Sequence, residues 1–144
     1  AAGGSAYANL YRNTIEYWNP SSSTNASDFG DLNFSTHSLG GCSDLTRGVV
    51  GGGYNGSSYE NSLDYVTIAS TGNATDFGDL NYSRSGTKSA GTDGVYGVFA
   101  GGYNGSARDD GINRITIQTT GNSTDFGNLT EGGSTASTTA GNAS

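Results

Sequence analysis

The chain has 144 residues, a net charge of −7 and only 32% hydrophobic residues, with 25 glycines and no methionine. An acidic surface repels phosphate backbones, so we expect no nucleic-acid binding. No run approaches the roughly 18 apolar residues that a membrane-spanning helix needs, so we expect no membrane insertion. The missing methionine indicates a processed protein or a fragment of a longer one.

A ten-residue motif occurs three times along the chain. Its copies are STNASDFGDL at 23–32, TGNATDFGDL at 71–80 and TGNSTDFGNL at 120–129. Glycine runs end at Gly4, Gly53 and Gly102, which are 49 residues apart each time. This constant spacing predicts a tandem array with one supersecondary unit per repeat. The approximate units are 1–37, 38–86 and 87–135, and residues 136–144 start a further unit.

Taken in chain order, the middle unit predicts four short strands joined by turns. Small residues fill the first segment at 38–44, and the second at 47–54 runs from valines into three glycines. The sequence NGSS at 55–58 predicts a tight turn, because Asn and Gly tolerate positive φ. The third segment at 63–70 alternates strand-forming residues, and the fourth at 74–80 follows a TGN turn. Four antiparallel strands in about 49 residues predict an all-β fold made of β-propeller blades.

Two kinds of residue are predicted to anchor the repeats. The glycine pairs Gly52–Gly53 and Gly101–Gly102 let backbones approach one another where inner strands converge. The phenylalanine of each motif is expected to fill the space between neighbouring blades, where full burial contributes about 1.5–3 kcal/mol. These phenylalanines are Phe29, Phe77 and Phe126.

No residue pattern predicts catalysis, a metal site or a cofactor. Cys42 is the single cysteine and is expected to be a small buried side chain, with a reactive thiol or an intermolecular bridge as the alternative. His37 is the single histidine, too few for a copper centre, and is expected to be a solvated loop residue. Aspartate pairs such as Asp76 and Asp79 predict hydrogen bonds to turn amides, because two carboxylates fall short of a calcium loop. Carboxylates from different loops could still serve a glycan-cleaving enzyme, and this alternative stays open.

The turn tips differ between units, with YENS at 59–62 and RDDG at 108–111. Repeat proteins often keep a constant scaffold and place binding in their loops. Tyr59, Glu60, Arg108 and Asp109 are therefore candidate residues for binding carbohydrate, which suits aromatic stacking beside polar groups. Neutral, solvated tips are the alternative. Nine N-x-S/T sequons are attributed to the Asn-, Ser- and Thr-rich composition and not to glycosylation.

Each unit resembles a diverged kelch repeat. The glycine pair is followed by Tyr65 after the turn, and Phe77 or Phe126 stands at the terminal Trp position. Phe thus replaces Trp, and Arg114 replaces the Tyr of the last unit. The repeat sequence RGVVGGGYNGS…LDYVTIASTGNATDFGDL resembles repeat arrays in virion structural and tail-fibre-like proteins of marine bacteriophages, especially cyanophages. This resemblance covers essentially the whole chain.

This resemblance implies a non-enzymatic, kelch-like β-propeller protein located on the virion. Its implied partners are other virion proteins, further copies or repeats that complete the propeller, and host-surface carbohydrate. A secreted bacterial adhesin or lectin is the first alternative, and a fragment of a glycan-active enzyme is the second.

About three blades are too few for a closed ring, since propellers usually have 4–8. The chain is therefore expected to belong to a larger array or to an oligomer. An open array exposes unpaired edges, so we do not expect the isolated chain to be a stable unit.

Overall fold

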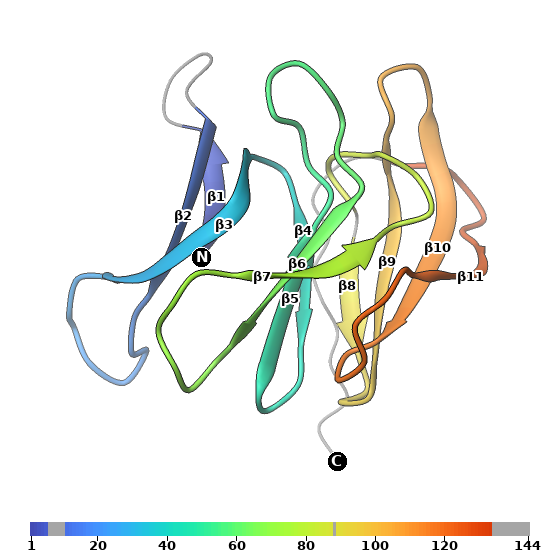
Figure 1. Ribbon diagram of the computed structural model, residues 1–144. Helices are drawn as coiled ribbons and strands as arrows, with labels where there is room; N and C mark the ends of the chain where they lie inside the picture. Colours follow the sequence, from blue (N-terminus) through green and yellow to red (C-terminus); the bar gives the residue numbers. More distant parts are fainter. Residues whose placement is uncertain (6–10, 88, 134–144) are drawn as a thin grey trace.

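A computed structural model describes residues 1–5, 11–87 and 89–133. The described residues form eleven strands in three antiparallel sheets, and they contain no helix. The sheets lie side by side in chain order, so that each repeat of the sequence contributes one sheet (Figure 1). This arrangement confirms the all-β prediction, and four strands per unit are present in two of the three sheets.

The three sheets have the same strand order but differ in size. Sheet 1 contains β1 (Ala2–Ser5), β2 (Tyr11–Tyr17) and β3 (Ser27–Thr36). Sheet 2 contains β4 (Gly40–Ser43), β5 (Arg47–Gly51), β6 (Ser62–Thr67) and β7 (Thr75–Asp79). Sheet 3 contains β8 (Ser89–Thr92), β9 (Tyr96–Tyr103), β10 (Arg108–Thr116) and β11 (Thr124–Asn128). By sequence position, β1 corresponds to β5 and β9, so sheet 1 has no described counterpart of β4 or β8.

The turns close with side chains that the composition favours. In the β5–β6 connection, Asn55 Oδ1 accepts hydrogen bonds from the backbone nitrogens of Ser57 and Ser58, both at 2.8 Å. In the β4–β5 turn, Asp44 Oδ1 accepts from the nitrogens of Thr46 and Arg47, both at 2.7 Å. Short polar side chains therefore replace a backbone acceptor at these tips, as expected for Asx turns.

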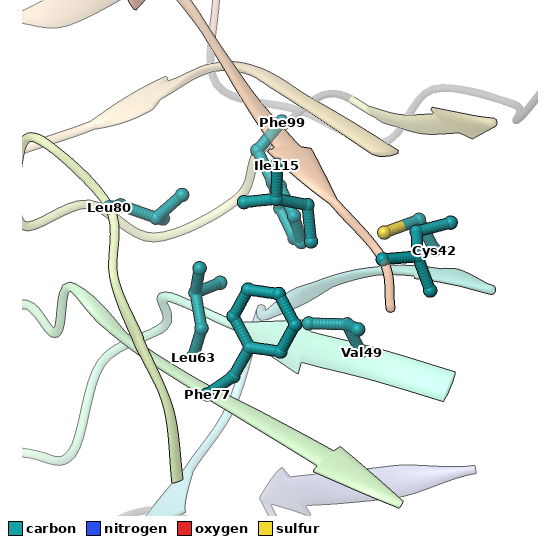
Figure 2. Close-up of a cluster of buried hydrophobic side chains, with 8 residues drawn as sticks. Cys42, Val49, Leu63, Phe77, Leu80, Phe99 and Ile115 are labelled. Carbon is teal, nitrogen blue, oxygen red and sulfur yellow. The ribbon is translucent and has the colours of Figure 1, made fainter. Parts of the chain in front are cut away.

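Two hydrophobic cores lie between the sheets. The core between sheets 1 and 2 contains Ile15, Phe29, Leu32 and Ala74, with Val50 and Val66 packed against it. The core between sheets 2 and 3 is larger (Figure 2). Its members are Cys42, Val49, Leu63, Phe77, Leu80, Phe99, Ile115 and Ile117. The protein therefore has no single central core, and each sheet buries apolar side chains against its neighbour.

The phenylalanines of the three motifs do not share one environment. Phe29 is 8% exposed and Phe77 is 2% exposed, and both fill the space between neighbouring sheets as predicted. Phe126 is 55% exposed, which departs from the prediction that it is an anchor of the same kind. The reason is that no described sheet follows sheet 3, so among the described residues Phe126 has Arg114 of its own sheet against its ring but no neighbouring sheet to cover it.

The motif also joins successive sheets through its backbone. Gly72 N donates to Phe29 O at 2.7 Å, Ala74 N donates to Asp31 O at 2.8 Å, and Asp31 N donates to Asn73 Oδ1 at 3.0 Å. The same three bonds recur one unit later: Gly121 N donates to Phe77 O at 2.7 Å, Ser123 N donates to Asp79 O at 2.8 Å, and Asp79 N donates to Asn122 Oδ1 at 3.0 Å. We call this set of three hydrogen bonds the inter-sheet clip. It uses the backbone of the second aspartate, whereas the sequence predicted a role for the carboxylates.

The clip explains the glycine of the DFG triplet. Gly78 has a φ of 136°, and a Cβ placed on it would lie 2.5 Å from the backbone of Gly121. A Cβ on Gly30 would collide in the same way with Gly72. Because the turn of one sheet lies directly on this glycine of the preceding sheet, a side chain there would force the two sheets apart.

Candidate binding surface at the loop end of the sheets

Five aromatic side chains form a continuous row across the three sheets. The row packs against the β5–β6 and β9–β10 loops, which lie at the same end of the sheets (Figure 1). Ring centroids are 5.4 Å apart between Tyr11 and His37, and 5.9 Å apart between His37 and Tyr54. The row continues through Tyr59, 4.9 Å from Tyr54, to Tyr103 at 5.7 Å. We call these residues the aromatic row. Each neighbouring pair lies within the range at which aromatic rings attract one another.

The repeat of the sequence produces this row. Tyr54 and Tyr103 follow the two glycine pairs, and their hydroxyls donate to Gly56 O at 2.9 Å and Gly105 O at 2.8 Å. A Cβ on Gly105 would lie 2.7 Å from the ring of Tyr59, so this ring packs directly under the loop of sheet 3. Tyr11 packs in the same way under Gly56 of sheet 2. Each loop therefore lies on an aromatic ring of the preceding sheet.

The candidate loop residues Tyr59 and Glu60 belong to this packed surface. Tyr59 is half-buried, and burial followed by the neighbouring Tyr103 and Tyr54 raises the pKa of its hydroxyl. Glu60 accepts hydrogen bonds from the Asn55 side chain and, at 3.1 Å, from Ser58 Oγ. Both residues thus hold the β5–β6 loop in shape.

Arg108 and Asp109 occupy the matching positions at the start of β10 and differ from each other. Arg108 is exposed, whereas Asp109 is partly buried and pairs with Arg84 at 3.5 Å. Asp109 Oδ1 also accepts from Gly111 N at 2.6 Å. Of the four candidate residues, Arg108 is therefore the one with a side chain fully available to a ligand.

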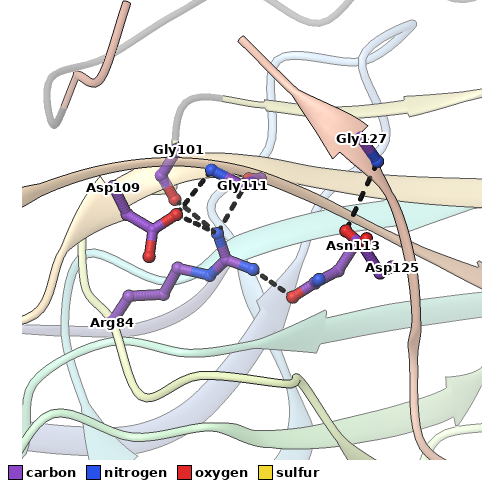
Figure 3. Close-up of polar contacts among 7 residues, drawn as sticks. All are labelled: Arg84, Gly101, Asp109, Gly111, Asn113, Asp125 and Gly127. Carbon is purple, nitrogen blue, oxygen red and sulfur yellow. Dashed lines mark hydrogen bonds and ion pairs between the residues drawn. The ribbon is translucent and has the colours of Figure 1, made fainter.

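A buried arginine connects this end of sheet 2 to sheet 3 (Figure 3). Arg84 is 0% exposed, and its Nη1 donates to Gly101 O and Gly111 O, both at 3.0 Å. Its Nη2 donates to Asn113 Oδ1. Burial lowers the pKa of the guanidinium, and the nearby Asp109 opposes that effect. This role of Arg84 was not predicted from the sequence, although the signal was there: Thr36 stands at the corresponding place in unit 1.

The glycine pairs lie directly beneath this segment. Gly52, Gly53, Gly101 and Gly102 are all buried. A Cβ on Gly52 would lie 2.8 Å from Arg84 O, and one on Gly102 would lie 3.0 Å from Ser85 O. The link between sheets 2 and 3 therefore passes over a glycine of each pair, at a separation that no larger residue permits.

The other residues singled out from the sequence have structural environments. Cys42 is buried, and desolvation followed by the charge of Asp44 raises the pKa of its thiol to about 12. His37 stacks on Tyr11, and its Nδ1 lies 2.7 Å from Ser38 Oγ, so it is not simply a solvated residue. Among the described residues, no group of three or more His, Cys, Asp and Glu side chains could hold a metal ion.

Two polar hollows recur at the opposite end of the sheets. One lies beside β6 and the TGN turn of sheet 2 and has a volume of about 380 Å³. Its counterpart in sheet 3 has a volume of about 220 Å³ and includes Arg114. Both are lined mainly by threonine, serine and asparagine, and because they recur with the hairpin they follow from its shape.

No protein-family model matches the chain, and no curated protein matches it. A search of the described residues for a helix that is both long and apolar enough to span a membrane finds none. The kelch-like and bacteriophage resemblances therefore stay predictions.

Proposed function

We propose that this chain is a non-enzymatic structural repeat protein of a bacteriophage particle, built as a kelch-like β-propeller in which each sheet is one blade. The observation that carries the proposal is the inter-sheet clip, which joins successive sheets through the same three hydrogen bonds. Because the same clip joins each pair of neighbouring sheets, every sheet has the same spacing and orientation relative to the preceding one, as a radial array of blades requires. The proposed location on a virion rests on the resemblance of the repeat sequence to repeat arrays of bacteriophage virion proteins.

We further propose that the loop end binds carbohydrate of the host surface. The aromatic row offers partly exposed rings, and the exposed Arg108, paired with Tyr103 in the sheet, stands beside it as a hydrogen-bond donor. Apolar ring surface next to polar groups suits a sugar, which has both apolar faces and hydroxyls. The net charge of −7 disfavours phosphate-rich ligands and leaves neutral or amino sugars as the expected class.

The location is tested with antibodies raised against residues 1–144 and gold-labelled on purified phage particles that encode the chain. The expected result is regular labelling at a fixed position on each particle in electron micrographs. Unlabelled particles together with labelled bacterial surfaces would contradict the virion location and favour the adhesin alternative.

The ligand class is tested on a glycan array with the wild-type chain and Arg108→Ala. We expect the variant to lose at least part of the bound signal, while Leu45→Ala leaves it unchanged. Leu45 is a suitable control because it is 97% exposed and lies in the β4–β5 turn at the opposite end of the sheets (Figure 1). Equal signals from all three proteins would contradict binding at the loop end, and release of sugar from envelope material would favour the enzyme alternative.

A further inference from the structure

The two outer faces of the array carry the two halves of the junction that joins the inner sheets. On its leading side, each inner junction uses the phenylalanine and leucine of the motif, as with Phe77 and Leu80. On its trailing side it uses a β-branched residue and a small residue of the next sheet. These trailing residues are Val66 and Ala74 in sheet 2, and Ile115 and Ser123 in sheet 3, and Val50 or Phe99 packs on the same side.

The leading half is complete but unoccupied by any described residue on sheet 3. Phe126 is 55% exposed, against 8% and 2% for its counterparts. Gly127 has a φ of 134°, close to the 136° of Gly78, but a Cβ on it would meet nothing within 4 Å. The strand β11 therefore holds the backbone shape that the clip requires, with open space where the turn of a following sheet would lie.

Part of the trailing half is present on sheet 1, where Ala1 stands at the position of Val50 and Phe99. Trp18 stands at the position of Val66 and Ile115 and is 55% exposed, whereas Ile115 is 4% exposed. Asn25 and Ala26 stand at the positions of Asn73 and Ala74 and are both exposed. A large apolar side chain in water, beside an unused copy of the clip sequence, marks a surface that is built for contact.

One residue of the trailing half differs from its counterparts. Thr24 stands where the other two units have Gly72 and Gly121, whose φ values are 157° and 148°. A Cβ on either glycine would meet nothing within 4 Å, so there is room for a threonine side chain. The backbone of Thr24 must nevertheless stay in a region of negative φ, which weakens the fit of this copy of the clip.

We propose that Trp18 and residues 24–26 of one copy dock on Phe126, Gly127 and Asn128 of a second copy. In this contact Ala26 N donates to Asn128 O and Asn128 N donates to Asn25 Oδ1, as in the two inner clips. Thr24 N donates to Ser22 O at 2.9 Å in the single copy and exchanges that bond for one to Phe126 O. A second copy is the occupant that this complementarity favours, because the leading face of sheet 3 and these residues of sheet 1 match the two sides of the inner clips. Such a head-to-tail contact is heterologous, so it closes into a ring or continues as a filament.

Two copies joined in this way supply six sheets, which lies within the usual range of 4–8 for a propeller. The inference therefore rests on the stacked-blade part of the proposed function and is independent of the virion location and of carbohydrate binding. It also names which faces meet and which residues form the contact.

The test is the mass of the 144-residue chain in solution, by analytical ultracentrifugation at several concentrations. Wild type is expected at a multiple of 14.6 kDa, with two copies as the simplest ring. Phe126→Asp and Trp18→Asp are each expected to weaken association about tenfold or more, because each puts a charge into the apolar centre of the contact. Both side chains are more than half exposed, and within its own copy the Phe126 ring lies against Arg114, so we expect each variant to keep the fold of wild type. Far-UV circular dichroism checks this point.

Mixing the two variants gives the sharpest result. Phe126→Asp keeps an intact trailing half and Trp18→Asp keeps an intact leading half, so the mixture is expected to form a one-to-one dimer and nothing larger. Leu45→Asp, at the exposed β4–β5 turn, is the control and is expected to associate like wild type. Thr24→Gly is expected to strengthen association, because it restores the glycine of the inner clips.

A wild-type chain that is folded and monomeric at every concentration would overturn the inference and assign these faces to another occupant. Association that both aspartate variants retain would overturn it as well, because a different surface would then be responsible. An oligomer with the expected variant effects, found together with unlabelled phage particles, would sustain this inference and refute only the virion location.

Discussion

The junction between sheets 1 and 2 and the junction between sheets 2 and 3 share one clip but bury different side chains. Val50 in the first corresponds to Phe99 in the second, and Val66 corresponds to Ile115. The second junction is therefore larger and better buried, with Phe99 and Ile117 both 0% exposed. The comparison teaches that the clip sets the spacing, whereas the apolar residues set how much free energy each junction contributes.

The polar contacts of the two junctions differ in the same way. In the first, the buried carboxylate of Asp64 accepts from Asn33 N at 2.8 Å and from Asn33 Nδ2 at 2.7 Å. In the second, the corresponding residue is Asn113, which accepts from the buried Arg84. Each junction thus contains one buried charge with its own partners, but the charges have opposite signs. A hydrogen-bonded charge is permitted at this place in either form, because its partners replace water.

The largest expected effect compares a buried and an exposed phenylalanine of the same motif. Phe77→Ala is expected to lower the free energy of unfolding by about 3–5 kcal/mol, because it removes the centre of the larger core. Phe126→Ala is expected to change it by less than about 0.5 kcal/mol when the protein is dilute enough to keep copies apart. Urea denaturation of the three proteins at one concentration measures both values, and equal losses would contradict the difference between the two sites.

The next effect concerns the buried positive charge of Arg84, which has no counterpart in the first junction. Arg84→Ala is expected to cost about 3 kcal/mol, since it leaves Asp109 without its partner and leaves buried carbonyls without a donor. Arg47→Ala is a useful control, because Arg47 is less buried and donates to a single carbonyl, that of Ile117, at 3.0 Å. The same urea titration checks the pair, and a smaller loss for Arg84→Ala than for the control would contradict the role of the buried network.

A smaller effect tests whether the clip is equivalent in the two junctions. Asn73→Ala and Asn122→Ala each remove the acceptor for one backbone nitrogen and are each expected to cost about 1 kcal/mol. Asn25→Ala, in the copy of the motif without a partner sheet, is expected to cost nothing in dilute protein. A large difference between the first two variants would show that the clip is not the shared element that we infer.

The smallest effect is a dependence of the stability on pH. It concerns the carboxyl group of Asp44 and, at the corresponding position of sheet 3, that of Asp93. Burial alone would raise the pKa of Asp44, but hydrogen bonds from Gln118, Thr46 and Arg47 outweigh it and lower this pKa to about 2. A carboxyl group with a folded pKa below the ordinary 3.8 stabilises the protein above that value, and this contribution is lost as the pH falls toward 2. Asp93 also has a lowered pKa, through backbone hydrogen bonds from Tyr96 and Val95.

The Asp44 contribution is measured with Asp44→Asn and wild type in urea at pH 5 and pH 2.5. We expect wild type to be more stable than the variant at pH 5 and the gap to narrow at pH 2.5. Gln118→Ala removes the one hydrogen bond that the Asp44 carboxylate accepts from a side chain of sheet 3. This variant is expected to be less stable than wild type at pH 5, and the difference between the two is expected to shrink at pH 2.5. A gap of the same size at both pH values would contradict the lowered pKa.

The strands were largely predictable because the repeat reports the same structure three times. The segments predicted at 47–54 and 63–70 correspond to β5 and β6, but both strands end earlier, at Gly51 and Thr67. The first ends there because Gly52 has a φ of 68°, and the second because the chain then enters the turn that forms the clip. Local sequence indicates where a strand forms but not where contacts with another sheet bend it away.

The site was less predictable because its contacts join residues of different units. The aromatic row brings Tyr11 under a loop that begins more than forty residues later, and nothing near Tyr11 in sequence indicates this. The pairing of Arg84 with Asp109 likewise joins the β7–β8 connection to the start of β10, and their approach depends on the packing of whole sheets. Phe126 was expected to resemble Phe77 because their local sequences match, and only the position in the array separates them.

The clip is made from main-chain atoms and one asparagine side chain, and this composition has a consequence for how such a protein changes over time. Mutation can enlarge a core, recharge a loop or replace a surface residue without altering the joint between units. Duplication or deletion of a whole repeat then lengthens or shortens the molecule while every remaining joint still fits. A single recombination event in such a gene can therefore change the number of repeats, and with it the length and the outer surface of the protein.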